Sequence, residues 1–328
     1  MGTGERVMRA APRPACLLCG SPGQPAHTHL RDRLFGAPGE WDLCRCANRE
    51  CGLYWLDPMP VAEDLSLAYA RYYTHAQAIE DDGHPAGRRR LLDRLYRFAL
   101  DLASVTVARR AARDLYLGST PPGRFLEVGC GDGNALLRLK ALGWEVEGQD
   151  IDPHAGAHGL GDSSIRVHRA PLEQLHLPEG RYDAIAMNHV IEHAVDPLAL
   201  LLECRRLLAP GGQLVVVTPN TASIGHKLAG ADWRPLEPPR HLFLFSVRNL
   251  PVLAGRAGYS RVEAWSTAAN AGSVGLVSWE LCKRGGHDMD RPPAGIPKLV
   301  GAGFQILASL AIKVWRNSGE EVVLRAWK

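Results

Sequence analysis

The chain has 328 residues, of which 46% are hydrophobic and 22% are charged, and its formal net charge is +3. These values are ordinary for a soluble globular protein, and they exclude a disordered chain or a coiled coil. The length favours one large domain with an accessory module, and the small positive charge gives little support for nucleic-acid binding.

The first 60 residues form a segment rich in cysteine, proline and glycine, without periodic hydrophobic runs. A C-x-x-C pair followed by glycine occurs near its start, and three more cysteines follow after a spacer. Two cysteine pairs in a reducing compartment are typical of a structural tetrahedral zinc site, and a metal suits a module that buries little core of its own. The predicted zinc ligands are Cys16, Cys19, Cys46 and Cys51. Cys44 is a spare candidate, and the alternative is a set of unpaired core cysteines.

Residues 61–118 are predicted to be helical, because apolar side chains recur at helical spacing from Leu91 to Leu102. Arginines are frequent on the other face, between Arg88 and Arg113. They indicate either an ordinary solvated face or a surface for an anionic substrate or a membrane.

Strand and helix signals alternate between residues 124 and 268. Buried strands are predicted at Arg124–Gly129, Glu145–Ile151, Tyr182–Met187 and Gln213–Thr218. Helices are predicted at Ala135–Leu142 and Leu198–Leu208. This alternation predicts an α/β fold with a parallel sheet that is covered on both faces. Glu320–Trp327 is predicted to be the last strand, so residues 270–318 are predicted to be an insertion before it.

An apolar run extends from Leu299 to Ile312, between Lys298 and Lys313. A membrane-spanning helix needs roughly 20 apolar residues. We therefore expect no membrane span, but a buried or interfacial helix with at most weak peripheral association. No apolar core precedes Cys16, so the sequence predicts no secretory signal and a cytoplasmic location.

Three glycines follow the first predicted strand of the alternating region, in the segment Glu127-Val-Gly-Cys-Gly-Asp-Gly133. Such glycines let a backbone turn sharply and approach a ligand closely. A dinucleotide fingerprint would carry its third glycine at position 134, where this chain has Asn, so a ligand without pyrophosphate is favoured. Asp150 ends the next strand about 20 residues further on, where a carboxylate can accept both ribose hydroxyls of an adenosine.

The segment Glu127–Gly133 resembles motif I of the class I S-adenosylmethionine (SAM)-dependent methyltransferases. The similarity covers roughly residues 120–268 and includes Tyr182–Asn188 and Leu207–Gly212. It implies a Rossmann-like seven-stranded sheet with helices on both faces and an antiparallel final strand, a role that suits Glu320–Trp327.

The resemblance also implies which residues contact SAM. The residues expected around its methionine part are Glu127, Gly129, Cys130, Gly131 and Gly133. Asp150 would hold the ribose, Leu172 and Glu173 would lie near the adenine, and Asn188 would line the sulfonium side.

A histidine cluster follows the strand that ends at Asn188, and the segment from there to Pro197 resembles the E-H-x-x-D-P segment of ubiquinone-type O-methyltransferases. A second histidine motif, Pro239-Arg-His241, lies where this subfamily often carries an acceptor-site loop. Methyl transfer needs an aligned acceptor and a group that removes its proton, and a histidine with a pKa near neutrality is a suitable base. His193 and His241 are the predicted candidates for this base.

Two alternatives for the cluster stay open. In the first, His189, Glu192 and His193 share one helical face and bind a divalent metal, as the E-x-x-E-H motif does in small-RNA 2′-O-methyltransferases. In the second, these side chains cap strands or helices and touch no substrate.

The N-terminal segment resembles the zinc ribbon of a bacterial methyltransferase subfamily, through Cys51–Pro60 and the pair Tyr72-Tyr73. The expected organisation is a zinc-ribbon module at 1–60, a helical lid or linker at 61–118, and a methyltransferase domain at 119–328 with the insertion at 270–318.

The sequence therefore predicts a methyltransferase that uses SAM, with structural zinc and a small-molecule acceptor. An oxygen nucleophile of a secondary metabolite or sugar-type substrate is favoured over nitrogen or carbon. The alternatives are an RNA methyltransferase with a metal at the histidine cluster, against which the weak net charge counts, and a SAM-binding protein without catalytic activity.

Overall fold

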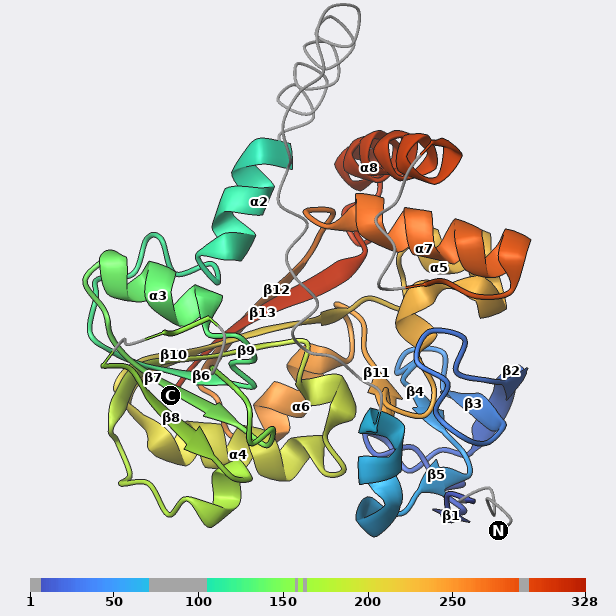
Figure 1. Ribbon diagram of the computed structural model, residues 1–328. Helices are drawn as coiled ribbons and strands as arrows, with labels where there is room; N and C mark the ends of the chain where they lie inside the picture. Colours follow the sequence, from blue (N-terminus) through green and yellow to red (C-terminus); the bar gives the residue numbers. More distant parts are fainter. Residues whose placement is uncertain (1–6, 71–104, 157–158, 162–163, 289–294) are drawn as a thin grey trace, which may run out of the picture.

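The computed structural model describes residues 7–70, 105–156, 159–161, 164–288 and 295–328. Its centre is a seven-stranded sheet with the strand order β12-β13-β10-β9-β6-β7-β8 (Figure 1). The strands are β6 (Arg124–Val128), β7 (Glu145–Asp150), β8 (Arg166–Arg169), β9 (Tyr182–Asn188), β10 (Leu208–Pro219), β12 (Arg261–Thr267) and β13 (Glu321–Trp327). Only β13 runs antiparallel to its neighbours, β10 and β12. The predicted Rossmann-like sheet with an antiparallel last strand is thus confirmed.

Alternating side chains of the central strands enter two separate hydrophobic cores, one on each face of the sheet. Leu126 and Ile185 belong to the core that is covered by α4 (Pro197–Leu207) and α6 (Leu250–Arg256). Phe125 and Ala184 belong to the opposite core, to which α3 (Asn134–Ala141) contributes. All four side chains are fully buried, which is why apolar residues stand side by side in both strands, at Phe125-Leu126 and at Ala184–Met187.

The N-terminal module contains a four-stranded sheet with the order β11-β4-β3-β2. Its strands are β2 (Gly23–Leu30), β3 (Trp41–Cys46), β4 (Tyr54–Leu56) and β11 (Phe243–Leu244). β11 comes from a much later part of the chain, and its Phe243 pairs with Trp55 of β4. A short pair, β1 (Ala10–Ala11) with β5 (Met59–Pro60), and the 3-10 helix η1 (Ala62–Tyr69) complete the module.

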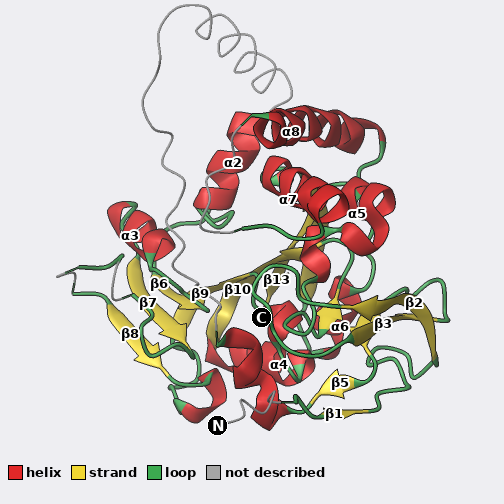
Figure 2. Cartoon of the chain, turned by 45° about the vertical axis from the view of Figure 1, so that its right-hand side comes forward, coloured by secondary structure: helices red, strands yellow, loops and turns green. Residues whose placement is uncertain are grey.

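The helix predicted from the spacing of Leu91 to Leu102 lies outside the described residues. The structure describes α2 (Val105–Arg113) after that gap. The segment 270–318 contains two helices that pack against each other, α7 (Ala271–Arg284) and α8 (Ile296–Val314), with α5 (Ile224–Ala229) beside them (Figure 2).

Helix α8 is longer than the apolar run that predicted it. It has 19 residues and is, by length and composition, the one described helix that could cross a membrane, although 33% of its apolar window is buried inside the protein.

Candidate functional site

All three glycines of the loop after β6 have a left-handed backbone, which favours glycine over other residues. Their φ angles are 71° at Gly129, 50° at Gly131 and 81° at Gly133. A side chain at Gly133 would also collide with Leu160, whose Cδ2 would lie 2.5 Å from the added carbon. A side chain at Gly131 would meet nothing within 4 Å, so the loop is open to a ligand at that point.

The loop offers few free amide groups to an anion. The amides of Gly129 and Cys130 both donate to the Gln149 carbonyl, at 2.7 and 3.0 Å. The Gly131 amide donates to Asp150 Oδ2 at 2.9 Å. At the start of α3, the Asp132 carboxylate accepts the amide hydrogen of Asn134 at 2.9 Å. A helix N-terminus that already holds a carboxylate is poorly suited to a phosphate, so the loop fits a ligand without one.

The Glu127 side chain is buried just before the glycines of this loop. Its Oε2 atom has no hydrogen-bond partner within the part of the chain that the structure describes. Burial, together with the nearby Asp132 and Asp150 carboxylates, raises the pKa of Glu127 to about 8. An unsatisfied buried carboxyl oxygen of this kind is suited to a donor from a ligand, such as an amino group.

The other residues expected to contact SAM lie at the same edge of the sheet or just beyond it. Asp150 and Asn188 are the last residues of β7 and β9, and both strands flank β6. Leu172 is buried and Glu173 is exposed in the 3-10 helix η2 (Leu172–Gln174). The Cys130 side chain points into the protein, because a carbon added to Gly148 would lie 2.7 Å from its Sγ atom.

His189 follows β9 and lies between two carboxylates. Its Nδ1 atom lies 3.1 Å from Glu192 Oε1 and its Nε2 atom lies 2.9 Å from Glu321 Oε1. Burial opposes the charge on this ring, but the hydrogen bonds to both carboxylates raise the pKa of His189 to about 10. The ring is therefore an imidazolium at neutral pH, and it is unsuited to act as a base or a metal ligand.

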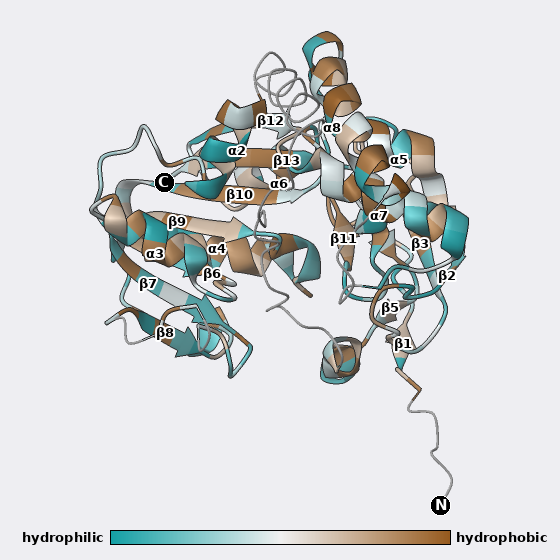
Figure 3. Cartoon of the chain, turned by 45° about the horizontal axis from the view of Figure 1, so that its top comes forward, coloured by the Kyte–Doolittle hydropathy of each residue, from teal (hydrophilic) through white to brown (hydrophobic). Residues whose placement is uncertain are grey.

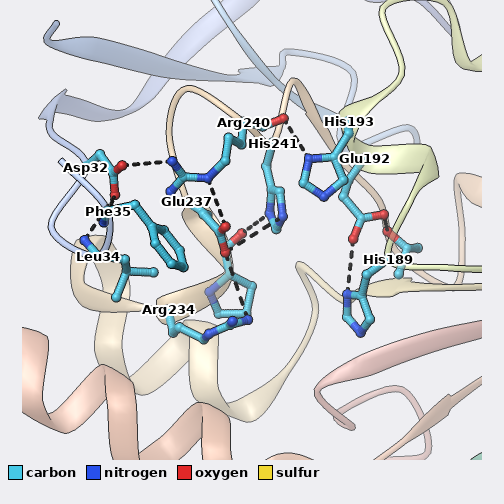
Figure 4. A network of polar contacts seen from close by, with 12 residues as sticks. Asp32, Leu34, Phe35, His189, Glu192, His193, Arg234, Glu237, Arg240 and His241 are labelled. Carbon is cyan, nitrogen blue, oxygen red and sulfur yellow. Dashed lines mark hydrogen bonds and ion pairs between the residues drawn. The ribbon is translucent and has the colours of Figure 1, made fainter. Parts of the chain in front are cut away.

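His193 and His241, the two predicted base candidates, lie against each other with ring centroids 4.6 Å apart (Figure 4). The Nδ1 atom of His193 lies 3.1 Å from the Arg240 carbonyl oxygen, and that of His241 lies 2.7 Å from the Pro235 carbonyl oxygen. Carbonyl oxygens only accept, so each of these hydrogen bonds requires the proton on Nδ1 and leaves a lone pair on Nε2. The Tyr69 hydroxyl, 2.9 Å from the same Nδ1 atom of His193, is then a second acceptor of that proton. Burial lowers the pKa of His241 to about 4 and also lowers that of His193.

The structure brings together a different set of candidate metal ligands from the one that the sequence predicted. Glu192, His193 and His241 offer ligand atoms that all lie within 4.8 Å of one another. His189 was expected in this group, but its backbone has a left-handed φ of 55° and only Ile191–His193 form a 3-10 helix, η3. The helical face that would join His189 to His193 is therefore not formed.

A buried charge network connects this cluster to the N-terminal module (Figure 4). The Arg240 side chain is fully buried, and its Nη1 and Nε atoms bond Asp32 Oδ2 at 2.8 Å and Glu237 Oε1 at 3.0 Å. Tyr69, at the end of η1, places its hydroxyl 2.9 Å from Nδ1 of His193. These four residues were not predicted. The only sequence signal near them is the Pro239-Arg-His241 motif, and nothing in it indicates a partner about 200 residues earlier.

The four predicted zinc ligands lie together in the N-terminal module. The sulfur atoms of Cys16, Cys19, Cys46 and Cys51 all lie within 4.8 Å of one another. Those of Cys16 and Cys51 are 3.6 Å apart, and those of Cys19 and Cys46 are 3.3 Å apart. Zinc–sulfur bonds of about 2.3 Å in a tetrahedron imply sulfur–sulfur distances of about 3.8 Å, so the set fits zinc. Cys44 packs against Gly23 and is not part of the group.

Known proteins with similar sequences share one kind of domain. A family model described as a methyltransferase domain matches residues 89–264, more than half of the chain. The ubiquinone biosynthesis O-methyltransferase of Cereibacter sphaeroides is 33% identical over 161 residues, which are 46% of this chain and 64% of that protein. Its Xanthomonas oryzae counterpart is 37% identical over 119 residues, 34% of this chain and 49% of that protein. The chain thus spans less than two thirds of these relatives.

Solved structures with similar folds include two methyltransferases. A SAM-dependent methyltransferase from Archaeoglobus fulgidus has a TM-score of 0.46 at 19% identity and covers 74% of this chain and 100% of its own. Phosphoethanolamine N-methyltransferase 2 of Haemonchus contortus, solved with SAM, has a TM-score of 0.45 at 17% identity and covers 84% of this chain and 62% of its own.

Proposed function

The chain belongs to the class I SAM-dependent methyltransferase family, and on that premise we propose that it transfers a methyl group from SAM to an oxygen atom of a small molecule. The observation that carries this proposal is the combination of a glycine loop suited to a ligand without phosphate with two histidines whose pKa values are lowered, His193 and His241. The relatives are ubiquinone biosynthesis O-methyltransferases, and that name supports oxygen as the methylated atom.

The residues at the glycine loop would hold the methyl donor. Glu127 has a buried oxygen suited to the donor's amino group, and Asp150 offers a carboxylate for the ribose hydroxyls. Leu172 and Glu173 would lie near the adenine, and Asn188 near the sulfonium side. When bound, SAM supplies a methyl group that its sulfonium already activates toward an in-line displacement.

The two histidines would then handle the acceptor's proton. His193 is the better base of the two, because its side chain is only partly buried, whereas that of His241 is 3% exposed. Its Nδ1–H is held by the Arg240 carbonyl oxygen, which leaves Nε2 to take the proton. A histidine with a lowered pKa is a weak base, so we expect an acceptor whose hydroxyl is already acidic, such as a phenol or an enol.

A second mechanism uses the same pair of histidines together with a metal ion. Glu192, His193 and His241 would supply one carboxylate and two neutral imidazoles, which together suit a divalent transition metal. Backbone carbonyls that fix each Nδ1–H are the usual outer partners of metal-binding histidines. In this mechanism the cation would orient and acidify the acceptor hydroxyl.

The cysteine group would hold a structural zinc ion. Four thiolates leave no open coordination position, so this metal would stabilise the module and take no part in the chemistry.

Calorimetry with SAM and a methyl-transfer screen with labelled SAM test the proposal together. We expect SAM and S-adenosylhomocysteine to bind, and label to appear in small phenolic or enolic metabolites of an extract from the source organism. Binding of NAD without SAM would overturn it. SAM binding without transfer would favour a non-catalytic protein, and salt-sensitive RNA binding with label in RNA would favour an RNA methyltransferase.

A further inference from the structure

Helix α8 exposes apolar side chains along its outer face. Leu299 and Val314 are 72% and 74% exposed, values that leave most of each side chain in contact with the surroundings. The exposed apolar residues follow one another at intervals of three to eight positions and form one stripe: Ile296, Leu299, Leu307, Leu310 and Val314. Residues at helical spacing lie on one face, so the stripe extends along the whole helix. Figure 3 shows α8 by the hydropathy of its residues.

The inner face of α8 is made mostly of small and polar residues, with Phe304 as its one aromatic side chain, packed against α7. Gln305 is fully buried and donates to the Ala268 carbonyl oxygen at 2.6 Å, while its Oε1 atom accepts the Gly272 amide at 3.0 Å. Ser309 is 3% exposed and donates to the Gln305 carbonyl oxygen at 2.7 Å. Gly301 lies so close to α7 that an added carbon would lie 2.8 Å from the Gly272 carbonyl oxygen.

This arrangement differs from that in a typical surface helix of a water-soluble protein. Such a helix turns its apolar stripe toward the core and its polar residues toward water. Here Gln305 and Ser309 meet the protein beside small apolar residues, while the row of large aliphatic side chains points away from it. The surroundings that suit such a face are apolar.

Positive charge surrounds the stripe. Lys298 and Lys313 are exposed on α8 itself, and the helix contains no acidic residue. Trp315 and Arg316, which are both exposed, follow its last turn. α2 lies beside it, because Arg109 bonds Gln305 Oε1 at 3.2 Å, and α2 adds the exposed Arg110 and Arg113 (Figure 2). An apolar face with lysines, arginines and a tryptophan at its margin is the composition of a helix that lies in the headgroup region of an anionic bilayer.

We propose that α8 lies flat on a lipid surface with anionic headgroups and that its stripe enters the outer part of the acyl layer. Spanning is disfavoured, because it would require the buried hydrogen bonds of Gln305 and Ser309 to be broken in hydrocarbon. A second copy of the chain is a less suitable partner for this stripe than a lipid surface. A symmetric contact through this stripe would bring like charges of the two copies together, Lys298 of one toward Lys313 of the other. The proposal does not depend on the methyl transfer proposed above.

Vesicle flotation tests this surface directly. The full-length protein should float with vesicles of phosphatidylcholine and phosphatidylglycerol and much less with phosphatidylcholine alone, and salt should weaken the binding. Leu299→Gln combined with Leu310→Gln should lower the partition coefficient at least tenfold, because each leucine loses much of its favourable transfer out of water. The matched control combines Leu142→Gln with Leu202→Gln, which are 52% and 47% exposed away from α8, and it should bind like the wild type.

Trp315 provides a second measurement. Its emission should shift to shorter wavelength on vesicle binding, and brominated lipids should quench the part of the signal that disappears in Trp315→Phe. Equal flotation of both double variants, or no preference for anionic vesicles, would overturn the proposal. A protein that sediments as a dimer, becomes monomeric in the α8 double variant and binds no vesicles would also overturn it, and would assign the stripe to self-association.

Discussion

Asp32 and Arg240 form an ion pair with 2.8 Å between Oδ2 and Nη1, although 208 residues of the chain separate them. Their side chains are 1% and 0% exposed. The pair joins the N-terminal module to the loop that carries His241. The module therefore helps to hold the candidate site in place.

Removing one member of this pair should destabilise the protein strongly. Asp32→Ala leaves the buried Arg240 guanidinium with Glu237 as its remaining carboxylate, and a broken buried ion pair costs about 3–5 kcal/mol. We expect a loss of about 3 kcal/mol in the free energy of unfolding, measured by urea titration. Asp64→Ala, which breaks the exposed pair of Asp64 with Arg9, is the control and should change little. Equal effects of the two variants would contradict the importance of the buried pair.

Asp150 should matter for SAM affinity. Asp150→Ala removes the carboxylate proposed to hold the ribose hydroxyls, and a hydrogen bond to a charged group is worth about 1.5–3 kcal/mol. We expect SAM and S-adenosylhomocysteine to bind roughly tenfold more weakly or worse in calorimetry. The same carboxylate accepts the Gly131 amide, so a melting curve of the variant must first show that the loop region still folds. Unchanged affinity in a folded variant would remove Asp150 from the site.

The cysteine group should bind about one zinc ion per chain, as four thiolate ligands imply. Cys16→Ser should lower both the zinc content, measured by elemental analysis, and the melting temperature. Cys44→Ser offers a matched control in the same module, since Cys44 lies outside the group of four. If Cys16→Ser keeps its metal while Cys44→Ser loses it, the ligand set is wrong.

Replacing either His193 or His241 should impair turnover without changing SAM affinity. A general base contributes about 10²–10⁴-fold, so His193→Ala should lower the rate by that factor on the true acceptor. Chelators should leave the wild type active if His193 is a base. If a metal is needed, chelators should abolish activity, added divalent ions should restore it, and Glu192→Gln should be as damaging as His193→Ala. Near-normal turnover of both His193→Ala and His241→Ala would show that neither histidine is the base, and would leave substrate positioning as the contribution of the site to catalysis.

His226 should make the protein sensitive to acid. It donates through Nδ1 to the Thr221 carbonyl oxygen at 2.8 Å and lies 2.9 Å from His27 through Nε2. Burial lowers the pKa of His226 to about 4, although the hydrogen bond to Thr221 acts in the opposite direction. A histidine with a lowered pKa stabilises the fold fully above its ordinary pKa of about 6.5, and that stability is lost as the pH falls toward the folded value.

Between pH 7 and pH 4.5, the free energy of unfolding should fall by about 2 kcal/mol because of His226. Urea unfolding at both pH values should show it as a smaller pH dependence in His226→Gln than in the wild type. The comparison of slopes matters here, because the substitution also removes the stacking of His226 on Trp233 and lowers stability at every pH. Identical slopes would show that His226 does not titrate in this range.

The sequence predicted the central sheet well where strands are buried on both faces. β6 and β9 each contain adjacent buried apolar residues, and their predicted bounds differ from the observed ones by one residue. β8 was not delimited, because Arg166–Arg169 lies at the edge of the sheet and alternates Arg, Val, His and Arg. A half-exposed edge strand carries too little hydrophobic signal to separate it from a loop.

The sequence predicted several residues of the site, but it did not predict how they are arranged. His193 and His241 were both singled out, yet their contact depends on how the chain folds over 48 positions, which no local pattern encodes. His189 was misplaced because the rule for helical neighbours was applied to a segment with a left-handed residue at its start. Buried charges such as Arg240 are hardest to predict, since a charged residue in a sequence usually indicates the surface.

The pairing of β11 with β4 has a consequence for how the protein is made. β4 leaves the ribosome with the first 60 residues, but its partner strand follows only at residue 243. During synthesis the edge of the N-terminal sheet is therefore open for the time needed to add nearly 200 residues, and an open edge invites pairing with other chains. The same dependence means that the N-terminal module cannot be moved to another protein as a self-contained cassette unless β11 is moved with it.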